Sequence, residues 1–195
     1  MRIDKNDLLL YAVTDRQWLG EASLAEQLEE AIQAGVTVVQ LREKELDFDA
    51  FVSLGKELQA VAKRHRIPFI INDAVDVALA LDADGVHVGQ SDMQAGDVRS
   101  RIGEGKILGV SAHSVEEALA AERNGADYLG IGAIYGTATK PDANTLSIET
   151  LQQICQAVSI PVVGIGGIAE GNIPNLNGSG IDGVAVVSAI FAQPD

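Results

Sequence analysis

The sequence predicts an α/β protein, a (β/α)8 TIM barrel formed by residues 1–195 as a single domain. Short runs rich in Val, Ile and Leu recur eight times without strict polar alternation, which is typical of parallel strands covered on both faces. Helix-like stretches separate these runs, and this alternation indicates a parallel sheet. An open doubly wound sheet is the main alternative. The short connections, and the lack of a dinucleotide-binding glycine motif after the first run, favour the barrel.

The strands and helices can be placed in order along the chain. The first helix brings Leu24, Leu28 and Ile32 to one face, and Ser23 with Glu26 has the pattern of a capping box at its start. We expect strands at residues 8–14, 36–41, 67–71, 85–89, 106–111, 127–132, 160–164 and 182–187, and helices that include 23–34, 48–65, 115–124 and 147–157.

A weak repeat marks every second strand. The segments AGVTVVQL, DADGVHVG, GADYLGIG and GIDGVAVV each place a small or acidic turn before a buried strand. After the last strand only AIFAQPD follows, so we expect the final outer helix to be missing or nearly so. Either the chain is truncated, or another subunit of a homo-oligomer covers that flank of the barrel.

Composition restricts the classes of partner. The chain is 47% hydrophobic and 22% charged, which are the proportions of a folded globular protein. A formal net charge of −14 disfavours nucleic acid, whereas a few clustered cations and a metal ion can still bind small anions. No apolar stretch approaches the ~18 residues of a membrane span, and the start MRIDKNDLLL is no export signal. With Cys155 as a buried structural thiol, we expect a cytoplasmic protein.

Cationic and amide side chains follow the second strand. Gln40, Arg42 and Lys44 alternate, so on an extended backbone they point to one side. Arg offers bidentate hydrogen bonds and Lys a point charge, which together suit a diphosphate. A solvated run of charges is an equally good interpretation at this point.

Carboxylates follow the third and fourth strands. Asn72 and Asp73 end one strand, and Asp92 comes shortly after its neighbour. Mg²⁺ commonly binds one or two carboxylates and completes its shell with water and phosphate oxygens. The sequence therefore suggests a magnesium site at this edge. A turn or helix cap, or an acid–base carboxylate pair, are the alternatives.

The remaining candidate residues lie later in the chain. Ser111 follows the fifth strand, and the long segment 136–145 carries Thr137, Thr139 and Lys140. Loops of this length are commonly functional, and we expect this one to close over the site and bring Lys140 with it. Glycines that end with Gly167, together with Val187 and Ser188, follow the last two strands, where barrels of this class often bind phosphate. His87 and His113 are interpreted as structural histidines.

Taken together, several motifs are recognisable. QLREK, IINDAVDVALAL, GVHVGQSD, GVSAHS, IYGTATK, VGIGGI and VSAIF, in this order, closely resemble the thiamin phosphate synthase family over nearly the whole chain. The resemblance implies a βα-barrel that joins hydroxymethylpyrimidine diphosphate to thiazole phosphate, uses Mg²⁺ and releases pyrophosphate.

The resemblance also implies residue roles. Asp73 and Asp92 would ligate Mg²⁺, and the catalytic residues would be Arg42, Lys44, Ser111 and Lys140. The pyrimidine diphosphate would be held by Gln40, Arg42, Lys44, Asn72, Ser111 and Lys140. The thiazole phosphate would be held by Thr137, Thr139, Gly167, Val187 and Ser188.

Three rival functions stay open from the sequence. A thiazole tautomerase on the same barrel relies on a histidine in the sixth-strand motif, where this chain has Ala133, and tends to lack the two aspartates. A non-catalytic barrel that binds thiamin intermediates would not need leaving-group chemistry. A barrel enzyme acting on another sugar phosphate is the third.

Overall fold

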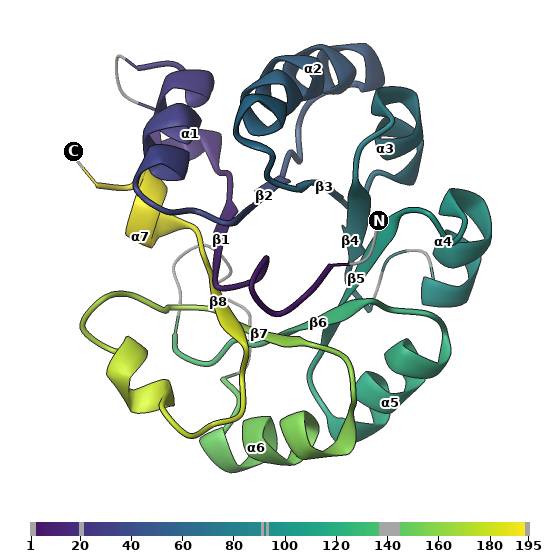
Figure 1. Cartoon of the computed structure of the whole chain (residues 1–195), viewed down its shortest axis with the longest axis vertical. Helices are drawn as coiled ribbons and strands as arrows, with labels where there is room; N and C mark the ends of the chain where they lie inside the picture. Colours follow the sequence, from purple (N-terminus) through teal and green to yellow (C-terminus); the bar gives the residue numbers. More distant parts are fainter. Residues whose placement is uncertain (1–2, 20–21, 91, 93, 137–144, 194–195) are drawn as a thin grey trace.

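The Val-, Ile- and Leu-rich runs form a ring of eight parallel strands in the computed structural model, with helices around the outside (Figure 1). The structure describes residues 3–19, 22–90, 92, 94–136 and 145–193. The strands are β1 (Leu10–Val13), β2 (Val38–Leu41), β3 (Phe69–Asn72), β4 (Gly85–Val88), β5 (Ile107–Ala112), β6 (Tyr128–Ile131), β7 (Val162–Ile165) and β8 (Gly183–Val186).

Closure of the ring decides between the two expected architectures. Tyr11 of β1 is in register with Val38 of β2 on one side and with Ala185 of β8 on the other, and both pairings are parallel. A doubly wound sheet would leave two open edges, so the barrel is confirmed and the open sheet is excluded.

Seven α-helices and two short 3₁₀ segments connect or follow the strands within the described residues. They are η1 (Arg16–Trp18), α1 (Leu24–Gln33), α2 (Phe48–His65), α3 (Val75–Leu81), α4 (Ala95–Ile102), α5 (Val115–Arg123), α6 (Ile148–Ala157), η2 (Ile173–Leu176) and α7 (Ser188–Phe191). Helix α1 has the expected capping box, in which Ser23 Oγ accepts from the Glu26 N–H and the Glu26 carboxylate accepts from the Ser23 N–H.

The outer layer is thinnest beside β7 and β8. The link between these strands contains only the 3₁₀ segment η2, and after β8 the described residues, which end at 193, form only the four-residue α7. A short final outer element was expected, and this is confirmed. The lack of a full α-helix between β7 and β8 was not expected. Pro174 and the glycine-rich flanks of η2 explain it, because they disfavour helix continuation.

The weak sequence repeat has a structural cause at the amino ends of the strands. The residue that precedes each even-numbered strand accepts a hydrogen bond from the backbone N–H near the start of the preceding odd-numbered strand. The four donor–acceptor pairs are Leu10–Thr37 at 3.0 Å, Phe69–Asp84 at 2.9 Å, Leu108–Asp127 at 2.8 Å and Val162–Asp182 at 2.9 Å. Each pair satisfies a backbone donor at the strand end and fixes the register of two neighbours.

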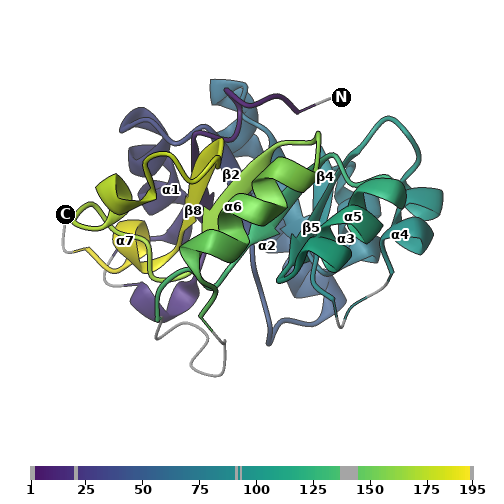
Figure 2. The same ribbon diagram turned by 90° about the horizontal axis from the view of Figure 1, so that it is seen from below.

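Two cores stabilise the barrel. One lies between strands and helices, and the other fills the ring with inward side chains that include Val38, Ile70 and Val163. Ile3 and Leu8 of the amino-terminal segment belong to the inner core and cover the amino end of the ring, so the open end is the one at which the strands finish (Figure 2). Among the described residues, no helix has the length and apolar character that crossing a bilayer requires.

Candidate active site

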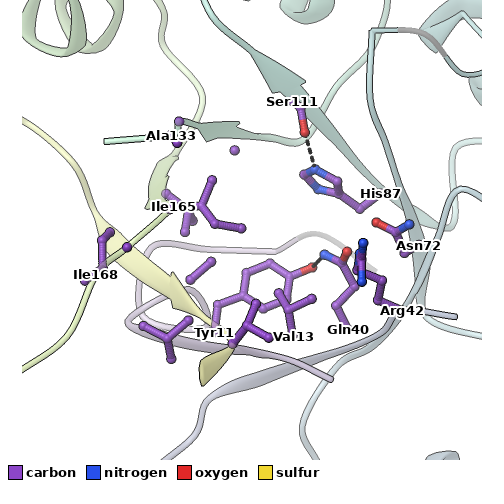
Figure 3. Close-up of a pocket in the computed structure, with 18 of the residues that line it drawn as sticks. Tyr11, Val13, Gln40, Arg42, Asn72, His87, Ser111, Ala133, Ile165 and Ile168 are labelled. Carbon is purple, nitrogen blue, oxygen red and sulfur yellow. Dashed lines mark hydrogen bonds between the residues drawn. The ribbon is translucent and has the colours of Figure 1, made fainter. Parts of the chain in front are cut away.

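A pocket opens at the carboxyl end of the ring, where inward positions of most strands converge (Figure 3). Both polar and apolar side chains line it. The polar ones include Gln40, Arg42, Asn72, His87, Ser111 and His113. The apolar ones include Val13, Ala133, Val163, Ile165, Ile168 and Val187. Ala133, Ile165 and Ile168 lie across the pocket from Arg42 and Asn72 (Figure 3). The pocket can therefore take a ligand with a flat apolar portion and a strongly polar one.

Several residues expected at the site do meet in this pocket. Gln40 and Arg42 come from the end of β2, Asn72 from the end of β3 and Ser111 from β5. Gly167, Val187 and Ser188 also line the pocket. These sequence segments are far apart along the chain, and closure of the ring brings them together. The part that each residue plays toward a ligand stays a prediction.

Lys44 does not continue the pattern of Gln40 and Arg42. Strand β2 ends at Leu41, so the alternation of side chains that the sequence suggested does not extend to Lys44. Its ammonium instead lies 2.9 Å from Asp73 Oδ2, and this carboxylate oxygen also accepts from the Asn72 amide at 2.6 Å. Lys44 is thus held at the rim by the carboxylate that we expected to bind the metal.

Arg42 contacts the residues that follow β1. The Arg42 backbone N–H donates to Thr14 Oγ1 at 3.1 Å, and one terminal nitrogen of its guanidinium lies 3.9 Å from Asp15 Oδ2. The neighbouring Glu43 turns away and accepts from Arg16 at 2.7 Å. Arg42 therefore faces the pocket, whereas the adjacent acid is engaged by another cation.

Asp73 and Asp92 lie at the ends of neighbouring strands. The Asp73 N–H donates to the His87 carbonyl at 2.8 Å, and Asp73 has the left-handed φ of 59°. Asp92 Oδ2 accepts from the Gly89 N–H at 2.8 Å, just beyond the end of β4. Among the described residues, no group of three or more His, Cys, Asp or Glu could hold a metal ion. Mg²⁺ commonly takes only one or two carboxylates and completes its shell with water and phosphate oxygens, so its binding by Asp73 and Asp92 stays a prediction.

The glycines after β7 pack tightly against the end of β6. Gly166 and Gly167 have positive φ values of 97° and 62°, and a Cβ on Gly166 would lie 2.6 Å from Ala133 Cα. Asn172 donates to the Gly167 carbonyl at 2.8 Å and fixes this turn. Only glycine fits these positions without strain, so the backbone itself forms this side of the pocket.

The floor of the pocket contains a polar group that the sequence did not reveal. Tyr11 and Tyr128 are buried inside the ring, and His87 lies between Tyr128 and Ser111. Burial raises the pKa of the Tyr11 and Tyr128 hydroxyls, so both stay neutral. His87 does have partners for both ring nitrogens, as expected of a structural histidine, but it also lines the pocket.

The remaining candidate residues lie on the rim or outside the described residues. His113 is half-exposed on the rim, where its backbone N–H and Nδ1 both contact the Glu117 carboxylate. Thr137, Thr139 and Lys140 lie outside the described residues, so their roles and the closure of their loop stay predictions.

Known proteins resemble the chain over nearly its whole length. A family described as thiamine monophosphate synthase matches residues 10–190. Thiamine-phosphate synthases of Clostridium acetobutylicum and Clostridium tetani are 54% and 52% identical, over 95% and 97% of this chain and 88% and 90% of theirs. A solved structure of thiamine phosphate pyrophosphorylase from Pyrococcus furiosus has a TM-score of 0.90 at 40% identity and covers 98% of this chain and 91% of that one.

Proposed function

Because the chain belongs to the thiamine monophosphate synthase family, we propose that it is the transferase that makes thiamin phosphate. The reaction joins a hydroxymethylpyrimidine diphosphate to a thiazole phosphate and releases pyrophosphate. One observation carries the proposal beyond family membership. Arg42, Asn72 and Ser111, in or just after three different strands, line one pocket, and apolar Ala133, Ile165 and Ile168 lie on its other side (Figure 3).

The two walls suit the two portions of each substrate. The pyrimidine and thiazole rings are flat and partly apolar, and they would fit against Ala133, Ile165 and Ile168. The charged groups then face the polar side, where Arg42 offers a guanidinium fork that matches phosphate oxygens. Lys44 adds a second cation at the rim after release from Asp73.

The chemistry places few demands on proton transfer. The bond between the pyrimidine methylene carbon and the diphosphate oxygen breaks, and its electron pair leaves with the diphosphate. The thiazole nitrogen then supplies a lone pair to form the new carbon–nitrogen bond. Because this nucleophile already has a free lone pair, the site needs no general base.

The residues of the chain act by positioning and by charge stabilisation. Arg42 and Lys44 bind the diphosphate and stabilise the negative charge that collects on it as the bond breaks. Close approach of the two rings along the apolar wall favours the bimolecular step. The same wall excludes water that would otherwise capture the cationic methylene carbon.

Mg²⁺ is the proposed cofactor. Asp73 and Asp92 would hold it, and when bound it would neutralise part of the charge of the diphosphate. Support comes from the placement of both carboxylates at the ends of the neighbouring strands β3 and β4. Turnover should therefore disappear after treatment with a chelator and return when Mg²⁺ is added.

The tautomerase alternative is not favoured. Its histidine position corresponds to Ala133, which is buried and lines the pocket without any titratable group. We also propose that the protein acts in the cytoplasm, and a homo-oligomer would cover the thin flank beside α7. The native mass in solution tests this assembly.

An assay of pyrophosphate release tests the function. Purified protein with Mg²⁺ should release pyrophosphate and form thiamin phosphate in equal amounts when both phosphorylated substrates are present. Each substrate alone should give no sustained release. Isomerisation of a thiazole phosphate without pyrophosphate would indicate the tautomerase, and binding without turnover would indicate a non-catalytic barrel.

A further inference from the structure

A continuous chain of hydrogen bonds crosses the inside of the barrel beneath the pocket. Gln40 Nε2 lies 2.8 Å from Tyr11 Oη, and Tyr11 Oη lies 2.7 Å from Tyr128 Oη. His87 Nδ1 lies 2.9 Å from Tyr128 Oη, and His87 Nε2 lies 2.9 Å from Ser111 Oγ. Figure 3 shows the first and last of these bonds. The chain therefore links five different strands and ends at Ser111, which lines the pocket.

With Gln40 Nε2 facing Tyr11, the protons of this chain have only one arrangement in which both tyrosine hydroxyls have an acceptor within the chain. The Gln40 amide nitrogen can only donate, so Tyr11 accepts from it. The Tyr11 hydroxyl proton then has Tyr128 as its acceptor, and the Tyr128 proton has His87 Nδ1. If any of these bonds ran the other way, a tyrosine proton in the barrel interior would lose its partner in the chain, which is unfavourable.

We infer that this chain makes His87 a positioning residue, which holds its proton on Nε2 and so leaves the Ser111 hydroxyl to donate to the substrate. His87 Nδ1 accepts from Tyr128, so Nε2 carries the imidazole proton and donates to Ser111 Oγ. Because Ser111 accepts from His87, its own proton is free for a ligand. An ionised phosphate oxygen can only accept, so the direction of the chain matches a phosphorylated substrate.

Two glycines provide independent support, because they leave the space that the chain occupies. A Cβ on Gly109 would lie 2.2 Å from Tyr128 Cζ and 2.5 Å from His87 Nδ1. A Cβ on Gly130 would lie 3.0 Å from His87 Cε1. Glycine thus stands at the inward positions of β5 and β6 where His87 and Tyr128 project. The contact between the two rings agrees, since the His87 and Tyr128 centroids are 5.5 Å apart and the ring planes are tilted by 39°.

The inference rests on the proposed function in one respect only, namely that the group accepting the Ser111 hydroxyl proton is a phosphate of the substrate. The proton position on His87 is a property of the protein alone and can be measured without substrate. A failure of the function and a failure of the inference are therefore distinguishable. If no pyrophosphate is released but His87 carries its proton on Nε2, the function is wrong and the direction of the chain stands.

The test is a ¹H–¹⁵N correlation spectrum of protein labelled with ¹⁵N-histidine, at about pH 8 where an ordinary imidazole is neutral. The protein has three histidines, and His87→Gln identifies the peaks of His87 by their loss. We expect a protonated Nε2 and an unprotonated Nδ1. A protonated Nδ1 in the unaltered protein would overturn the inference.

Matched tyrosine variants extend the test. Tyr128→Phe removes the hydroxyl that donates to His87 Nδ1, so His87 should no longer hold a single tautomer. Turnover should fall by about 10- to 100-fold, the range seen when the hydrogen-bond partner of a metal-ligating histidine is removed. Tyr135→Phe removes a hydroxyl that donates to the Asn172 carbonyl outside the chain, and it should leave the His87 spectrum unchanged.

Conservative replacement separates positioning from packing. His87→Gln keeps an amide donor for Ser111 and should retain more turnover than His87→Leu, which keeps only bulk. Equal turnover of His87→Gln and His87→Leu would overturn the inference. So would a Tyr128→Phe variant that keeps both wild-type turnover and the wild-type tautomer of His87.

Discussion

The close packing around Gly109 gives a sharp prediction for the substitution Gly109→Ala. The added Cβ would lie 2.2 Å from Tyr128 Cζ and 2.3 Å from its hydroxyl oxygen. Carbon atoms in contact are normally about 3.5–4.0 Å apart, so the Tyr128 ring has to retreat by more than about 1 Å. Tyr128 is fully buried between Tyr11 and His87, so this retreat breaks its hydrogen bonds to one or both of them.

The size of the effect follows from these contacts. Overpacking a core destabilises by about 1–3 kcal/mol, and each lost hydrogen bond adds about 0.5–1.5 kcal/mol. Replacing a glycine by alanine also lowers the conformational entropy of the unfolded chain, and this offsets roughly 0.4–1 kcal/mol of the destabilisation. We therefore expect a net loss of roughly 2–3 kcal/mol, which lowers the melting temperature by about 4–12 °C for a chain of this size.

Urea unfolding measures this loss of stability as a lower midpoint urea concentration, while the slope of the unfolding free energy against urea concentration stays constant. Gly171→Ala is the matched control, because a Cβ on Gly171 meets nothing within 4 Å and Gly171 has no positive φ. It should leave the stability unchanged or raise it slightly. If the two variants unfold within about 0.5 kcal/mol of each other, the packing argument for the barrel interior is wrong.

Three other perturbations test the site and the thiol. Asp92→Ala should lower Mg²⁺-dependent turnover on the order of 100-fold without lowering the melting temperature, and wild-type turnover would refute its metal role. Lys140→Ala should reduce turnover on the order of 100-fold with little change in stability, and an unaltered rate would remove Lys140 from the mechanism. Burial raises the pKa of the Cys155 thiol to about 11, so alkylation by iodoacetamide should be slow at neutral pH and accelerate until about pH 11. Rapid alkylation at pH 7 would contradict this.

Local patterns were sufficient to predict most of the barrel. Buried runs of branched residues located the strands, and the capping box at Ser23 located the start of α1. The repeat before the even-numbered strands can be recognised in the sequence, but its structural cause cannot. That cause is a hydrogen bond from a neighbouring strand, for example from Phe69 to Asp84. The alternation of strands and helices does not hold between β7 and β8, where Pro174 and the flanking glycines allow only the short η2.

The rim of the site was predictable for a geometric reason. Parallel strands finish at one end of the ring, so polar residues that follow them converge there whatever their separation in sequence. Lys44 departs from its expected position because β2 ends at Leu41.

The interior of the ring was less predictable. Tyr11, His87 and Tyr128 meet only after closure, and each alone is an ordinary core residue. A sequence signal does exist, since Gly109 and Gly130 stand at inward positions beside them.

The central claim is that the ends of β3 and β4 bring two carboxylates to one divalent ion beside the diphosphate site. Crystals grown with Mn²⁺ and pyrophosphate test it directly through the anomalous signal of the metal. We predict one peak about 2.1 Å from a carboxylate oxygen of both Asp73 and Asp92, with pyrophosphate against Arg42. A metal bound elsewhere, or carboxylates of Asp73 and Asp92 that face separate regions of solvent with pyrophosphate bound, would contradict the account.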